Sequence, residues 1–166
     1  MSQRHEELKD AVTRDYDEMR ALLARLTPEM MARRATDGWR VGQLAGHVAV
    51  SPRGVIYVLD RLRKGRNVRI PKPFGFVVNV RNWWTVRAFS NPTREQLLSA
   101  FEDAHQALLA YLDGLSDDEL DRGGHFLDNG HQTVYENVIR SADHSREHAA
   151  VLREATGLAA AVSPAQ

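Results

Sequence analysis

The stretch 133-TVYENVIRSADHSREHAAVLREATG-157 decides the fold that the sequence predicts. Thr133 and Glu136 have the spacing of a capping box, in which two side chains close the first turn of a helix, and Gly157 is a typical residue just past a helix end. Between them, apolar residues recur at helical spacing. The stretch therefore predicts one long amphipathic helix that must bury one face against partners.

Three further helices of this kind are predicted. Apolar residues at helical spacing indicate a helix over residues 6–26, a second over about 41–64 and a third from Thr93 to near Gly114. Pro52 lies inside the second helix and removes one backbone hydrogen bond, so we expect a kink there. Four long helices with one long connection between the second and third predict an all-α four-helix bundle with a crossover.

Composition limits the organisation and the partners. With 166 residues, 43% of them hydrophobic, one core is expected, which we assign to a single domain over residues 1–157 with a flexible tail over 158–166. Equal numbers of basic and acidic residues, 22 each, argue against nucleic acid or an anionic membrane as partner. The sequence shows neither a signal peptide nor a membrane span, so a cytoplasmic protein is expected.

The chain contains no cysteine. Disulfides, thiolate metal ligands and a thiol nucleophile of the protein's own are therefore excluded. Any sulfur chemistry needs a thiol supplied by a bound molecule.

Two histidines of the last predicted helix, His144 and His148, are four residues apart and share one face. Val151 and Leu152 lie near the same direction, so both imidazoles are expected to point into the bundle. His47 repeats this pattern on the second helix. Imidazole is the commonest ligand of zinc and similar divalent ions, and three protein ligands leave positions open for water or substrate. The three histidines therefore predict a catalytic metal centre between two helices.

Other histidines have less specific surroundings. A lone buried histidine is most often hydrogen-bonded within the core, which is how we interpret His105 on the third helix. A turn-rich segment before the last helix contains His125, Asp128, Asn129 and His131. Among these, His131 is the best candidate for a general base or for a group that orients a metal ligand.

The long connection offers candidates for substrate contact, since loops on a rigid scaffold often carry specificity. The candidates are Phe74, Phe76, Asn79, Asn82, Trp83 and Trp84. Covering the end of the bundle or forming a dimer contact is an equally good interpretation of these aromatic residues. A basic run precedes them, consisting of Arg61, Arg63, Lys64, Arg66, Arg69 and Lys72. Its simplest explanation is the favourable interaction of cations with a helix C-terminus.

The segments 39-WRVGQLAGH-47 and 144-HSREH-148 resemble the two signatures of the DinB-like superfamily, which includes mycothiol-dependent maleylpyruvate isomerases and bacillithiol S-transferases. The resemblance covers nearly the whole chain. It implies a bundle in up-down-down-up order and a divalent metal, usually zinc or nickel, at His47, His144 and His148. Many members of the superfamily are dimers, so a homodimer is expected.

The resemblance leaves three functions open. One is an S-transferase or isomerase in which the metal activates a small thiol, mycothiol or a similar one, for attack on a small electrophilic substrate. The second is a metal-dependent hydrolase. The third is a non-enzymatic stress-response bundle whose structural metal would need a fourth ligand, for which His105 and His131 are candidates.

This sequence departs from the family pattern at two positions. Arg40 stands where many relatives have a serine or threonine helix cap, and Pro52 follows His47 by about one and a half turns. Arg40 predicts a different cap for the second helix. Pro52 affects the geometry with which His47 can bind a metal.

Overall fold

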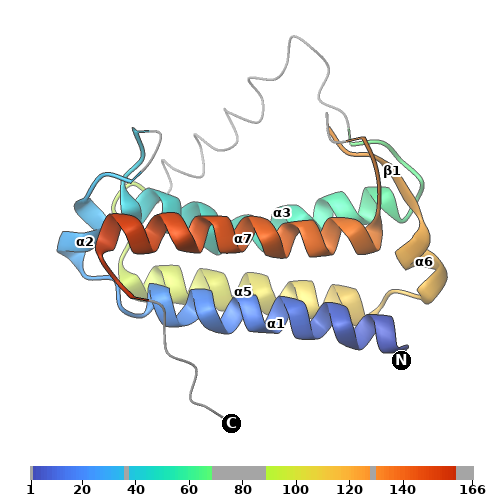
Figure 1. Ribbon diagram of the computed structural model, residues 1–166, viewed down its shortest axis with the longest axis horizontal. Helices are drawn as coiled ribbons and strands as arrows, with labels where there is room; N and C mark the ends of the chain where they lie inside the picture. The colour runs from blue at the N-terminus through green and yellow to red at the C-terminus, as the bar shows by residue number, and fades with distance from the viewer. Residues whose placement is uncertain (1, 36–37, 69–88, 128–129, 160–166) are drawn as a thin grey trace.

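The computed structural model describes residues 2–35, 38–68, 89–127 and 130–159. Four long helices dominate it: α1 (Gln3–Leu23), α3 (Val41–Leu62), α5 (Arg94–Asp113) and α7 (Val134–Thr156). They lie side by side along the length of the molecule (Figure 1). The predicted four-helix bundle is confirmed.

The helices run in up-down-down-up order. In Figure 1, α1 and α7 run in one direction, and α3 and α5 run in the other. Each helix packs against two others, in the cyclic order α1, α5, α3, α7. α3 ends and α5 begins at opposite ends of the bundle (Figure 1). The predicted crossover falls mostly on residues 69–88, which lie outside the described residues, and so does most of the flexible tail expected over 158–166.

Local side-chain contacts explain where α7 begins and ends. The hydroxyl of Thr133 accepts a hydrogen bond from the Glu136 backbone N–H at 3.1 Å, and the Glu136 carboxylate accepts one from the Thr133 N–H at 2.8 Å. Gly157 follows the helix with a φ of 73°, in the left-handed region that glycine adopts without strain. The predicted capping box and stop are both confirmed.

The second predicted helix has a cap of a different kind, as its Arg40 led us to expect. The Gln43 side-chain oxygen accepts a hydrogen bond from the Arg40 backbone N–H at 2.8 Å. The helix then continues through Pro52 as one uninterrupted element. Pro52 therefore does not end the helix.

Four short elements close the ends of the bundle. They are α2 (Pro28–Ala32), α6 (Asp117–Asp121), β1 (Gly123–His125) and β2 (His131–Thr133). The strands pair antiparallel as a small sheet, with His125 opposite His131. The prediction of a purely helical chain missed this hairpin, because strands of three residues are too short to show an alternating pattern.

The bundle core consists of two separate apolar clusters. One includes Leu23, Val41, Leu97 and Leu152, and it fills the end of the bundle near α2. The other includes Leu8, Leu59, Leu112 and Val138, and it fills the end near α6. Between the two clusters lies a layer that contains polar side chains from several helices.

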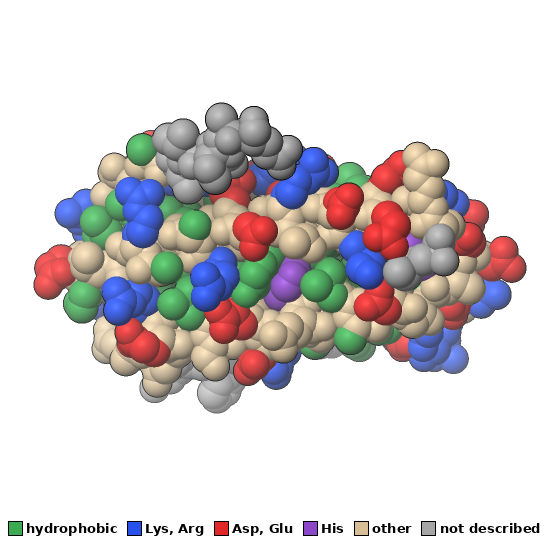
Figure 2. All heavy atoms as spheres, turned by 90° about the horizontal axis from the view of Figure 1, so that it is seen from below, with side chains coloured by type: hydrophobic (Ala, Val, Ile, Leu, Met, Phe, Trp, Pro, Cys, Tyr) green, Lys and Arg blue, Asp and Glu red, His purple; other side chains and the backbone are tan. Residues whose placement is uncertain are grey.

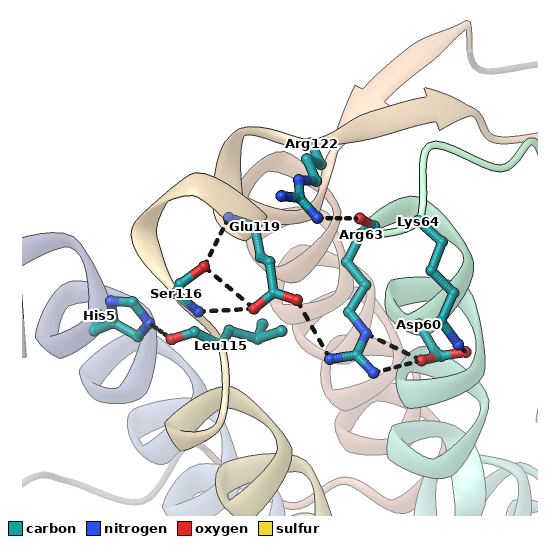
Figure 3. Close-up of polar contacts among 8 residues, drawn as sticks. All are labelled: His5, Asp60, Arg63, Lys64, Leu115, Ser116, Glu119 and Arg122. Carbon is teal, nitrogen blue, oxygen red and sulfur yellow. Dashed lines mark hydrogen bonds and ion pairs between the residues drawn. The ribbon is translucent and has the colours of Figure 1, made fainter.

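The basic residues at the end of α3 bind neighbouring groups. Arg63 donates to Asp60 at 3.0 Å and to Glu119 of α6 at 3.5 Å, and Lys64 pairs with Asp60 at 2.7 Å (Figure 3). In the same region the buried His5 hydrogen-bonds through its ring Nε2 to the Leu115 carbonyl at 2.8 Å. The contacts of Arg63 with Glu119 and of His5 with Leu115 join different elements. Arg69 and Lys72 lie outside the described residues.

The surface carries both signs of charge. Acidic and basic side chains are mixed over the face shown in Figure 2. Within the described ranges, no helix is both long enough and apolar enough to cross a bilayer.

Candidate metal centre

His47, His144 and His148 meet at the middle of the bundle. One ring nitrogen from each lies within 4.8 Å of those of the other two. The closest pair is Nε2 of His144 and Nε2 of His148, at 3.0 Å. The His47 ring stands almost perpendicular to both others, with centroid distances of 6.5 Å to His144 and 5.3 Å to His148. Sequence reasoning thus predicted correctly which three histidines come together.

Two helices supply this cluster. Four residues make slightly more than one turn, so α7 places His144 and His148 one above the other. The packing of α3 against α7 brings His47 to them. On its other side, the His47 ring makes an edge contact with Trp39 at 5.5 Å between centroids. The Ser51 hydroxyl also donates to the His47 carbonyl at 2.8 Å. Trp39 therefore contacts the ring of His47, and Ser51 contacts its backbone.

The prediction that both histidines of α7 are buried was wrong. The side chain of His144 is 55% exposed, and His148 is half-buried. The buried stripe of α7 passes through Val138, Ala142 and Ala149, so the histidines flank it. Of the two residues used to place the stripe, Leu152 is fully buried and Val151 is only half-buried. The cluster consequently sits where the core meets solvent, where an ion or a small molecule can reach it.

Burial keeps His148 in the neutral form. Desolvation lowers the pKa of His148 to about 4, with further lowering from the neighbouring His144 and His47. At neutral pH its imidazole is therefore unprotonated. Since a metal ligand has to be deprotonated at the binding nitrogen, this histidine is ready to bind without first releasing a proton.

A carboxylate lies next to the ring of His144. Nδ1 of His144 lies 3.4 Å from Oε2 of Glu147. A proton on Nδ1 in this contact leaves the lone pair on Nε2, which faces His148. The sequence signal for this contact is the spacing of three residues between His144 and Glu147 on a helix.

The spacing of the cluster fits a divalent ion. Two imidazole nitrogens bound at about 2.0–2.1 Å to one tetrahedral zinc ion lie roughly 3.3 Å apart. The observed 3.0 Å between the two Nε2 atoms of α7 is close to this value. The three imidazoles can therefore hold one ion after small side-chain rotations, with at least one position left for a ligand from outside.

The other predicted site residues have different surroundings. His105 is buried, as expected, and its ring stacks on Tyr16 with 3.9 Å between centroids. His131 lies exposed on β2, before the start of α7. At about 1.5 Å per residue, the ten residues from Val134 to His144 span roughly 15 Å. The structure therefore does not bring His131 to the three histidines.

The remaining candidates fall partly outside the described residues. His125 lies on β1 opposite His131 and is exposed. Asp128 and Asn129, together with all six aromatic and amide candidates between residues 74 and 84, belong to stretches that the structure does not describe. The substrate contacts predicted for the six residues between 74 and 84 stay predictions.

One buried carboxylate was missed altogether. Asp15 of α1 is half-buried and lines the same central layer as His144 and His148. In the sequence it falls within the charged run of an amphipathic helix, RDYDE. Nothing in that local pattern separates it from solvated acidic residues, because its burial depends on how α1 packs against α7.

Comparison with known proteins identifies related folds. The family model described as the DinB superfamily matches residues 11–152. A search among curated proteins gives no match. Among solved structures, YfiT from Bacillus subtilis, described as "a probable metal-dependent hydrolase with an unusual four-helix bundle topology", superposes with a TM-score of 0.73 at 17% sequence identity. That match covers 95% of this chain and 89% of YfiT.

Two further solved structures are similar. The mycothiol-dependent maleylpyruvate isomerase has a TM-score of 0.70 at 14% identity, with 92% of this chain and 63% of the isomerase covered. An uncharacterised protein from Clostridium difficile 630 has a TM-score of 0.67 at 17% identity, with coverage of 93% and 96%. At these identities the likeness concerns the fold.

Proposed function

This chain belongs to the DinB superfamily, and on that basis we propose that it is a divalent-metal-dependent enzyme for small electrophilic substrates, with a low-molecular-weight thiol as the nucleophile. The observation that carries the proposal is the convergence of His47, His144 and His148 at the border between core and solvent. Zn²⁺ is the ion we propose first and Ni²⁺ second. The likeness to a mycothiol-dependent isomerase supports mycothiol or a related thiol as cosubstrate.

The protein's own residues have separate tasks in this proposal. The three imidazoles hold the ion, Glu147 keeps the Nε2 lone pair of His144 facing it, and Trp39 restrains the ring of His47. A bound divalent cation with three neutral ligands keeps its full charge and favours the deprotonated form of a thiol or water. In transfer to a haloalkane, the sulfur–carbon bond forms as the carbon–halogen bond breaks. The halide leaves with the electron pair, and the thiol proton passes to solvent.

The first test concerns the metal. The purified protein should contain about one divalent ion per chain, and His148→Ala should lose it, measured by elemental analysis. His125→Ala is a suitable control, because this exposed histidine on β1 lies outside the cluster. Unchanged metal content in His148→Ala would refute the site.

A second test concerns the reaction. Protein loaded with Zn²⁺ or Ni²⁺ is incubated with mycothiol and a small haloalkane, and the conjugate is measured by mass spectrometry. We expect the conjugate to form with loaded protein and to fall to the background rate in His148→Ala. Equal rates with loaded and metal-free protein would contradict metal activation of the thiol.

Hydrolysis is the second candidate function. It is favoured by the likeness to YfiT, which is described as a probable hydrolase. YfiT has a higher TM-score than the isomerase, and this chain covers a larger share of it. Metal-dependent cleavage of small esters or amides, without any thiol conjugate, would establish this alternative. The homodimer expected from the family is part of the same proposal, and light scattering would then report twice the chain mass of 18.7 kDa.

A further inference from the structure

A cavity of about 80 Å³ lies in the layer between the two apolar clusters. All four long helices contribute to its walls, and His144 and His148 form one side of it. A cavity of this size has room for more than one water molecule. It is therefore an inner chamber, directly beside the three histidines, for a small chemical group.

One wall of the chamber carries a carboxylate with an unused acceptor. The side chain of Asp15 is 13% exposed, and its Oδ1 lies 3.5 Å from Nε of Arg146. Its other oxygen, Oδ2, is buried and has no hydrogen-bond partner among the described residues. A buried acceptor without a partner is destabilising, so a native structure rarely keeps one without a reason.

The other walls are aromatic and apolar. The Tyr16 ring stacks on His105 at 3.9 Å and on Phe101 at 5.1 Å between centroids, with interplanar angles of 18° and 16°. All three rings line the chamber. Burial lowers the pKa of His105, which keeps this ring neutral. A carboxylate beside neutral aromatic rings forms a favourable environment for a small cation.

We propose that this chamber binds a small substrate group that carries N–H donors and a positive charge, such as an amidinium or a primary ammonium. Oδ2 of Asp15 accepts a hydrogen bond from the group, and the ring stack of Tyr16, His105 and Phe101 contacts its apolar part. The rest of the substrate then extends towards His144 and His148, which places its reactive end at the metal centre. The inference deepens the proposed function and rests on it for the reaction, whereas binding in the chamber itself needs no metal.

The test uses three small probes of the same shape: acetamidinium, neutral acetamide and anionic acetate. Each is titrated into the metal-free full chain and into Zn²⁺-loaded protein, and binding is followed by NMR signals of Asp15, Tyr16 and His105. We expect acetamidinium to shift these signals saturably and to bind at least tenfold more tightly than acetate. Equal binding of the two ions, or no shift at these residues with acetamidinium, would overturn the proposal.

Two variants locate the interaction. Asp15→Asn keeps the shape of the side chain and should weaken acetamidinium binding at least tenfold, since hydrogen bonds to a charged group are the stronger kind. Asp10→Asn removes an exposed carboxylate from the same helix and should leave the affinity unchanged. Ala142→Leu puts a larger side chain into the chamber and should abolish binding. Wild-type affinity in either Asp15→Asn or a folded Ala142→Leu contradicts the assignment.

Metal analysis of the same samples separates this proposal from the proposed function. If protein incubated with Zn²⁺ binds acetamidinium but retains no metal at the histidines, the chamber is supported and the metal enzyme is refuted. Metal binding without acetamidinium binding would support the metal enzyme and refute the chamber.

Discussion

Gly46 directly precedes the proposed ligand His47, and we predict that Gly46→Ala destabilises the protein because there is no space for a side chain. A Cβ at this position would lie 2.3 Å from Cβ and 2.4 Å from Cγ of Phe89. Non-bonded carbon atoms pack at about 3.5–4.0 Å, so α3 or Phe89 would have to move by about 1 Å or more. Overpacking of this kind costs about 1–3 kcal/mol.

Gly42→Ala on the same helix is a matched control. The nearest atom to its added Cβ would be Cβ of Met31 at 3.3 Å, which a shift of a few tenths of an ångström relieves. Both substitutions replace a glycine of α3 by the residue with the highest helix propensity, so part of this gain cancels when the two variants are compared. Gly46→Ala should therefore be less stable than Gly42→Ala by about 1–3 kcal/mol.

The assay is equilibrium unfolding of metal-free protein in urea, followed by circular dichroism. A displaced α3 also moves His47, so Gly46→Ala should bind Zn²⁺ more weakly than Gly42→Ala in a competition titration. If the two variants agree within about 0.5 kcal/mol, the size of an ordinary surface effect, the close contact with Phe89 has no energetic consequence and the reasoning fails.

Three further predictions concern stability. The pKa of about 4 for His148 in the folded protein lies below the ordinary 6.5, so on acidification the unfolded chain takes up this proton first. The free energy of unfolding of the metal-free protein, measured in urea, should thus fall between about pH 6.5 and 4, and it should fall more steeply than that of His148→Gln. The same pH dependence in both proteins would contradict this. Thr133→Ala removes the hydroxyl that caps α7 and should cost about 1 kcal/mol in the same assay, whereas no loss would show that the cap is dispensable. Leu152→Ala empties a fully buried position and should cost about 2–5 kcal/mol, against less than about 0.5 for the exposed Glu154→Ala.

The helices could be predicted from the sequence because the signals that define them are local. Thr133, Glu136 and Gly157 fix α7 within a few residues of its ends, and the observed hydrogen bonds are those that the spacing implies. The grouping of His47 with the two histidines of α7 also followed from helical phase. It required only that the two helices pack against each other.

The depth of each side chain could not be predicted in the same way. Helical phase gave only the approximate direction of the buried side of α7. His144 lies at the edge of that side, next to solvent, so its exposure depends on the angle at which neighbouring helices pack. Asp15 is the opposite case, a charged residue that packing covers. The β1–β2 hairpin was missed because its strands are defined by pairing across a loop, which short segments do not encode locally.

The division of the core into two apolar clusters has a consequence for evolution. Each cluster closes one end of the bundle with side chains from several helices, so most contacts that hold the helices together lie outside the polar side chains of the layer between them. Substitutions in that layer can change the shape and charge of the chamber while both ends keep the helices in place. A scaffold built in this way can acquire new substrates by changing a few central side chains, and its sequence can diverge widely while its architecture persists.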